Sequence, residues 1–133
     1  MQAWIPFLIG AAHVVVALSV VAHGAFFWKE AIDGKKLLMD SKTFGFSEDL
    51  AAQIAPLLVN SGVYNLGITI GLALSFVPGP HQFVARIFFL SFATVAGIVG
   101  LKTLPRALGA KAFIGQSVVG VIALILVLVS SQK

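Results

Sequence analysis

The chain has 133 residues, of which 59% are hydrophobic and only 11% are charged, whereas an ordinary soluble domain is about 25% charged. So small a chain has too much surface to hide so many apolar side chains, which excludes a water-soluble globular fold and indicates one integral membrane domain over residues 1–133. The net charge of +4 does not indicate nucleic acid, because the nine lysines and arginines flank apolar runs, and the absence of cysteine excludes disulfides, thiolate metal sites and cysteine nucleophiles.

Four apolar segments are long enough to cross a hydrocarbon layer of roughly 30 Å as helices. The expected spans are residues 3–28, 54–76, 83–103 and 110–130. Pro78, Gly79 and Pro80 end the second span, since proline lacks the amide hydrogen that a helix requires. The sequence therefore predicts an all-α fold, a four-helix transmembrane bundle.

The basic residues predict the orientation of this bundle. Seven of them lie in the loops that follow the first and third spans: Lys29, Lys35, Lys36, Lys42, Lys102, Arg106 and Lys111. The opposite side carries only Arg86 and Lys133. The positive-inside rule then places both termini on the non-cytoplasmic side, and we expect a multi-pass protein of a bacterial inner membrane or an organellar membrane.

The polar connection over residues 29–53 holds all five acidic residues: Glu30, Asp33, Asp40, Glu48 and Asp49. A solvated loop is the simplest interpretation, and a docking loop for a partner or for lipid headgroups is the alternative. Ser47 predicts a helix start, because a hydroxyl caps free amides and the carboxylates that follow it favour the positive end of a helix. Pro56 is expected to kink this helix where it enters the membrane.

Polar side chains gather in the second span. Asn60, Tyr64, Gly67 and Gly71 share one face at about 100° per residue, and Ser61 and Asn65 lie beside that face. Amides and a phenol in hydrocarbon need hydrogen-bond partners. Two interpretations stay open: bonds to a neighbouring helix, or a binding pocket or polar pathway that opens toward the basic side.

Small residues at helical spacing predict close contact between the spans. The candidate helix-packing residues are Gly67, Gly71, Gly97, Gly100 and Gly120. Gln116 in the fourth span also needs a partner, and a hydrogen bond to Asn60 or Tyr64 would hold the bundle together. The small-residue faces are candidate contacts with protein partners or with a second copy, and membrane lipids are the expected neighbours of the rest.

The histidines raise the question of a metal or a pigment. His13 and His23 point roughly 80° apart and lie about 15 Å apart along the first span, so they cannot share a metal and no metal site is expected. Each is a candidate single ligand for haem or a chlorophyll-type pigment. Hydrogen bonding is the simpler role, and no cofactor is expected. His81, in the proline-rich turn, is expected to be solvated.

No motif for hydrolysis or group transfer is present, so no catalytic residue and no enzyme are expected. Between the helix ends only histidine is ionisable, which disfavours proton-coupled transport by a single copy. The expected role is a structural or accessory component of a membrane complex. The alternative is a small oligomeric transporter, or a protein that binds a small molecule or lipid at Asn60, Tyr64 and Asn65.

The run LVNSGVYN over residues 58–65 resembles the NQGxYN signature of DUF1304, a family of small bacterial membrane proteins of unknown function. Phe44-Gly45 before the second span, the segment 87–100 and Gly115-Gln116 resemble further parts of that family in the same order. Ser61 replaces the usual glutamine, and His23 and Gly24 stand near the place of a glutamate. The resemblance implies a four-helix membrane fold and assigns no activity.

Overall fold

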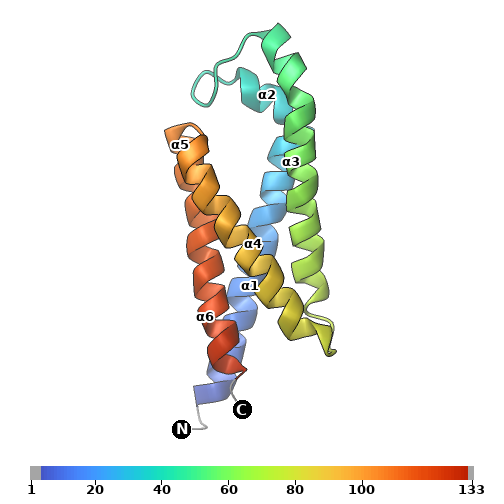
Figure 1. Cartoon of the computed structure of the whole chain (residues 1–133), viewed down its shortest axis with the longest axis vertical. Helices are drawn as coiled ribbons and strands as arrows, with labels where there is room; N and C mark the ends of the chain where they lie inside the picture. Colours follow the sequence, from blue (N-terminus) through green and yellow to red (C-terminus); the bar gives the residue numbers. More distant parts are fainter. Residues whose placement is uncertain (1–3, 132–133) are drawn as a thin grey trace.

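The computed structural model describes residues 4–131, and over these residues it confirms the predicted all-α fold. Four helical spans are long and apolar enough to cross a membrane: Ile5–Ile32, Glu48–Leu74, His81–Thr103 and Arg106–Ser130. They run up and down in chain order (Figure 1). Residue 3, the expected start of the first span, and Lys133 lie outside the described residues.

Two of the spans contain π-helical turns. The first span is α1 (Ile5–Phe27), continued by the π-helical turn η2 (Trp28–Ile32). The fourth span begins as α5 (Arg106–Ala112), passes through the π-helical turn η3 (Phe113–Val118) and ends as α6 (Val119–Ser130). Each π turn holds one more residue than an α turn, which changes the direction of the side chains around it.

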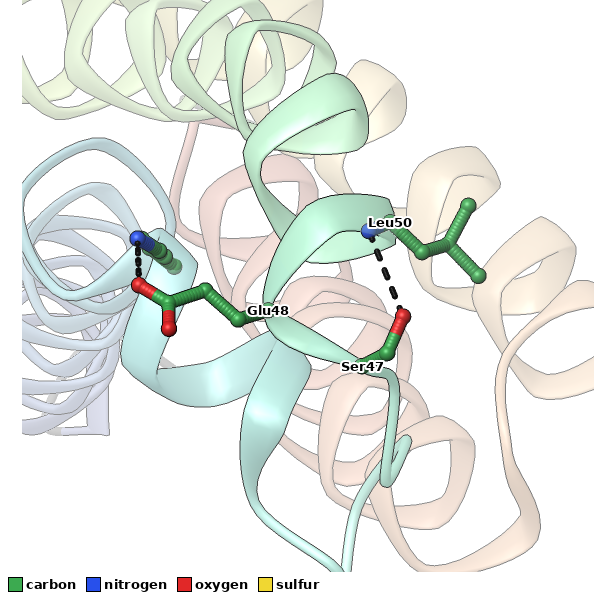
Figure 2. A network of polar contacts seen from close by, with 4 residues as sticks. Ser47, Glu48 and Leu50 are labelled. Carbon is green, nitrogen blue, oxygen red and sulfur yellow. Dashed lines mark hydrogen bonds and ion pairs between the residues drawn. The ribbon is translucent and has the colours of Figure 1, made fainter.

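The second and third spans are single helices, α3 (Glu48–Leu74) and α4 (His81–Thr103). The connection before α3, expected to be a loop, is largely helical, because the first span continues to Ile32 and α2 (Gly34–Met39) follows. The predicted helix start is confirmed: Ser47 Oγ accepts a hydrogen bond of 3.4 Å from the Leu50 amide (Figure 2). Glu48 accepts one of 2.8 Å from Lys35 Nζ, which ties α2 to α3.

The start of α1 and the end of α6 lie at one end of the molecule, and α2 and α5 lie at the other (Figure 1). We call the second end the basic end, because it carries the seven basic residues of the two longer connections, and the first the terminal end. α1 packs between α3 and α6. α4 crosses the bundle diagonally, close to α3 at the turn that joins them and away from it toward the basic end (Figure 1). α3 and α4 therefore lie close together near the terminal end and apart toward the basic end (Figure 1).

The main core lies in the half nearer the termini. Its eight buried residues come in pairs from α1, α3, α4 and α6: Ala12 and Val16, Ile68 and Leu72, Leu90 and Ala93, Ala123 and Val127. Large apolar side chains such as Leu57, Phe88 and Ile125 are instead exposed on the outer faces. Outward apolar residues are what lipid contact requires, so the four-span protein is an integral membrane protein.

The Arg86 side chain bonds to Ser75 across the turn between α3 and α4. Its guanidinium donates to Ser75 Oγ at 3.3 Å and to the Ser75 carbonyl at 3.2 Å, and it lies 5.3 Å from the centre of the Phe76 ring. Carbonyls at a helix C-terminus carry partial negative charge, which favours a cation there. Arg86 is only 7% exposed, so its charge stabilises the end of α3 and does not face lipid headgroups.

Three of the expected packing glycines support α4 against the fourth span. A Cβ at Gly97 would lie 2.9 Å from the Ser117 amide nitrogen, and one at Gly100 would lie 3.3 Å from Ala112 Cβ. A Cβ at Gly120 would overlap the Thr94 side chain. In α3, a Cβ at Gly71 would overlap the Phe89 ring.

Gly67, an expected packing residue, has no neighbouring helix against it within residues 4–131. A Cβ at this position would meet no atom within 4 Å. The buried face of α3 instead contains Gly62, Asn65 and Ile68. That face is rotated away from the one that Asn60 and Gly67 share.

Candidate functional site

Five polar side chains from three spans meet inside the bundle, and Asn65 is at their centre. Its Oδ1 accepts hydrogen bonds from His23 Nδ1 at 2.8 Å and from Gln116 Nε2 at 3.4 Å. Its Nδ2 donates to Glu30 Oε2 at 2.8 Å, and Ser61 Oγ donates to the same oxygen at 3.0 Å. We call these five residues the Asn65 network.

The hydrogen bonds of this network determine which atoms donate. Glu30 Oε2 receives two hydrogen bonds and is therefore an acceptor, whether or not the other oxygen carries a proton, so the amide nitrogen of Asn65 faces Glu30 and the amide oxygen faces His23. His23 therefore carries its proton on Nδ1, and its Nε2 is an acceptor. The His23 side chain is fully buried, and Nε2 has no hydrogen-bond partner among residues 4–131.

The network lies within the apolar spans. Asn65 is nine residues before the end of α3 at Leu74, and Glu30 is two residues before the end of the first span at Ile32. Polar and ionisable groups within membrane spans are costly and usually functional or paired.

Glu30 is the site residue that sequence reasoning placed in the polar connection. The structure puts it in η2, where the Asp33 amide donates to the Trp28 carbonyl five residues earlier at 3.1 Å. Gly62 lets this turn lie directly on α3, since a Cβ there would come within 2.9 Å of the Ala31 amide nitrogen. The carboxylate of Glu30 thereby reaches α3. The expectation that histidine is the only ionisable residue inside the bundle is corrected by this contact.

A cavity of about 690 Å³ adjoins the network at the basic end, between α3, α4 and α5. Its polar lining includes four members of the network, Glu30, Ser61, Asn65 and Gln116. Apolar and aromatic side chains form most of the remaining wall, namely Phe26, Leu37, Phe44, Leu58, Tyr64, Ile68, Phe92, Val95, Ala96, Val99, Leu104, Leu108 and Ala112. Thr43, Gly100, Thr103 and the two lysines Lys29 and Lys111 complete the wall. The cavity thus combines an apolar wall with a few converging polar groups.

The loop after α2 contributes Thr43 and Phe44 to this cavity. Asp40 holds the loop in shape, because its carboxylate accepts from the Thr43 hydroxyl at 2.5 Å and from the Lys42 amide at 3.4 Å. These hydrogen bonds to the charged form lower the pKa of Asp40. Gly45 adopts a φ of 64°, a left-handed conformation that glycine takes without strain.

The structure separates the residues of the expected polar patch. Ser61 and Asn65 join the network, whereas Asn60 is exposed and makes no side-chain hydrogen bond to residues 4–131. Tyr64 is 61% exposed and lines the cavity from its rim. The partner of Gln116 is Asn65, not Asn60 or Tyr64. Asn65 faces inward because it continues the buried line of Ile68 and Leu72.

The other two histidines lie outside the network. His13 Nδ1 is 2.7 Å from the Ile9 carbonyl one turn earlier, and its ring centre is 5.7 Å from that of Phe76. His81 is exposed at the start of α4. Among residues 4–131 no three histidine, aspartate or glutamate side chains are grouped to hold a metal ion.

Comparison with known proteins agrees with the resemblance found in the sequence. The sequence model of a family described as "Protein of unknown function (DUF1304)" matches residues 11–128. The chain belongs to the DUF1304 family. No curated protein and no solved structure matches this DUF1304 chain significantly. The matched segment includes the whole Asn65 network, but the family description assigns no activity.

Proposed function

We propose that this DUF1304 protein binds a small, largely apolar molecule in the cavity at the basic end and that it does so without catalysing a reaction. The observation that carries the proposal is the cavity itself, about 690 Å³ with apolar walls and converging polar side chains. Sites for small molecules have typically 300–1,000 Å³ and this same combination of linings. The size supports a ligand of drug-like or single-chain lipid dimensions.

The route to the cavity supports a ligand that arrives from the membrane. α3 and α4 are separated toward the basic end (Figure 1), and the cavity wall includes side chains of both helices, such as Leu58 and Val95. An apolar molecule dissolved in the lipid would meet this region without crossing water. Its polar group would find the hydrogen-bonding atoms of Ser61 and Gln116 at the end of the cavity.

The test is to fill the cavity and look for loss of a bound molecule. Ala96 lines the cavity on α4, so we expect Ala96→Trp to occupy it. Ile98→Trp is the matched control, because Ile98 is 42% exposed on the same helix and does not line the cavity. Native mass spectra of protein extracted gently from its own membrane should show an adduct with the wild type and with Ile98→Trp, and none with Ala96→Trp.

An adduct that persists in Ala96→Trp contradicts the proposal, as does wild-type protein without any adduct. A mass that corresponds to two copies and an adduct would support a small oligomeric transporter that binds its substrate in this cavity. Both variants need a melting temperature close to that of the wild type for the comparison to be valid.

A structural or accessory role is the second candidate, and one observation favours it. The Asn65 network links α1, α3 and η3, and hydrogen bonds between spans commonly serve packing. In that case the mass spectrum would show unequal chains, and the protein expressed alone would not accumulate in the membrane. Stable accumulation of the isolated protein would count against this role.

A further inference from the structure

We infer that the ligand of this cavity is an organic cation with an apolar body, held by the Glu30 carboxylate in exchange for a proton. The inference rests on the proposed function and adds the chemical class of the ligand. It comes from the contacts that Glu30 makes and from those that it lacks.

Glu30 has no counter-charge among residues 4–131. The ion pairs within 4.0 Å in this part of the chain join Lys29 to Asp33 and Lys35 to Glu48, and neither includes Glu30. Its hydrogen-bond donors, Ser61 and Asn65, are both neutral. A part-buried carboxylate without a counter-charge favours a proton or a cation beside it. The protein therefore leaves one of these to be supplied from outside.

One oxygen of this carboxylate remains available. Ser61 and Asn65 both donate to Oε2, and no side chain of residues 4–131 donates to Oε1. Glu30 lines the cavity, and Oε1 is not among the fully buried atoms without a partner. Oε1 thus has a free lone pair and is not fully buried.

Aromatic rings surround the same space. Phe26, Phe44, Tyr64 and Phe92 all line the cavity. The face of an aromatic ring is negative and attracts cations, particularly quaternary and protonated amines. A carboxylate combined with several rings in one apolar cavity is the arrangement expected for an organic ammonium ion.

The positive side chains of the cavity do not pair with Glu30. Lys29 Nζ bonds to Asp33 at 3.3 Å and its side chain is 64% exposed, and Lys111 is exposed on α5. The other titratable groups near Glu30 are His23 on α1 and Tyr64 on α3, while the cavity residues of α2 and α4 include none. Glu30 is therefore the acidic group that binding would titrate.

The exchange balances in atoms and charge. In the empty cavity Glu30 carries a proton on its carboxyl group; binding places the ligand cation against the carboxylate and releases that proton to solution. One proton leaves for each cation that enters. Binding therefore weakens as the pH falls, because the proton competes for the same oxygen.

The experiment uses two probes of equal size and opposite charge, tetraphenylphosphonium and tetraphenylborate. Each is titrated calorimetrically into the purified protein in a neutral detergent, in buffers of different ionisation enthalpy. We expect saturable binding of the phosphonium ion, release of about one proton per ion at a pH where Glu30 is protonated when empty, and no saturable binding of the borate.

Glu30→Gln should lower the affinity for the phosphonium ion about tenfold or more, the usual effect of losing one desolvated charge pair, and should abolish proton release. Glu30→Asp keeps the charge and should retain both effects in weaker form, which separates a lost charge from a misfolded protein. Asp49→Asn is the matched control, since Asp49 is exposed at the start of α3 and makes no ion pair within residues 4–131.

Unchanged phosphonium binding by Glu30→Gln overturns the inference, and so does equal binding of the borate. A neutral apolar probe separates failure of this inference from failure of the proposed function. If pyrene, a neutral apolar probe, binds the wild type and not Ala96→Trp while the phosphonium ion does not bind, the cavity is a ligand site but Glu30 does not select cations. If neither probe binds, both proposals fall.

Discussion

At the scale of single residues, Asn65 shows how one buried amide organises a site. Its amide nitrogen donates to the Glu30 carboxyl group, and its amide oxygen accepts hydrogen bonds from His23 and Gln116. Asn60 is the same residue type in the same helix, yet it faces outward and forms no side-chain hydrogen bond within residues 4–131. The two asparagines therefore provide a matched pair that differs in surroundings.

Replacing Asn65 should cost much more stability than replacing Asn60. Asn65→Ala removes the partner of His23 Nδ1 and Gln116 Nε2 and one donor to Glu30, and leaving buried polar groups unpaired costs about 1–3 kcal/mol. Asn60→Ala should change the free energy of unfolding by less than about 0.5 kcal/mol. Thermal unfolding in detergent, followed by intrinsic fluorescence, compares them. Equal losses would contradict the role given to Asn65.

At the scale of elements, the approach of η2 to α3 determines where Glu30 lies. Gly62 is the residue on which this approach depends, because the Ala31 backbone occupies the place of its Cβ. The polar members of the site outside α1 and α3, Glu30 and Gln116, both lie in π-helical turns. Such turns are frequent at functional sites, and here they carry side chains into the bundle.

Two glycines of α3 should respond in opposite ways to the same substitution. Gly62→Ala forces η2 away from α3, and overpacking of this kind costs about 1–3 kcal/mol. Gly67→Ala meets no neighbour and should stabilise the helix by up to about 1 kcal/mol through its better helix propensity. The measurement is the midpoint of thermal unfolding of each variant, together with phosphonium binding.

We expect Gly62→Ala to lose phosphonium binding, since Glu30 moves away from Ser61 and Asn65, and Gly67→Ala to keep it. A Gly62→Ala protein that is as stable as the wild type and binds equally well would show that the contact between η2 and α3 does not position the carboxylate.

At the scale of the whole molecule, the bundle has a packed half near the terminal end and a half with a cavity near the basic end. The core of small and branched residues holds the terminal end together, and the cavity occupies the basic end. Since the Arg86 charge is engaged at the end of α3, the basic side chains that face the surroundings in residues 4–131 lie at the basic end. From this distribution the positive-inside rule predicts that the basic end faces the cytoplasm.

The orientation has a direct test, because the natural chain has no cysteine. Lys36 on α2 and His81 at the start of α4 are both exposed, at opposite ends of the bundle. In intact cells, a membrane-impermeant maleimide should label His81→Cys and should label Lys36→Cys only after permeabilisation. The reverse pattern would invert the orientation, and labelling of both variants in intact cells would contradict the four-span topology.

Much of this protein follows from its sequence alone. Composition and the lengths of the apolar runs determined an all-α fold with four spans, because the backbone must satisfy its own hydrogen bonds in lipid. Ser47 and the acidic residues after it determined where α3 begins. The run over residues 58–65, together with Phe44-Gly45, the segment 87–100 and Gly115-Gln116 in the same order, indicated the DUF1304 family.

Only the tertiary structure decided which side chains face one another. Lipid is as apolar as the interior of the bundle, so hydrophobic periodicity does not determine the rotation of a helix in a membrane. That rotation depends on steric fit and on polar partners from other helices, such as Gly62 against Ala31 and Asn65 against His23. For this reason the residue at the centre of the site is Asn65 and not Asn60. Glu30, which was expected in a solvated loop, lines the cavity.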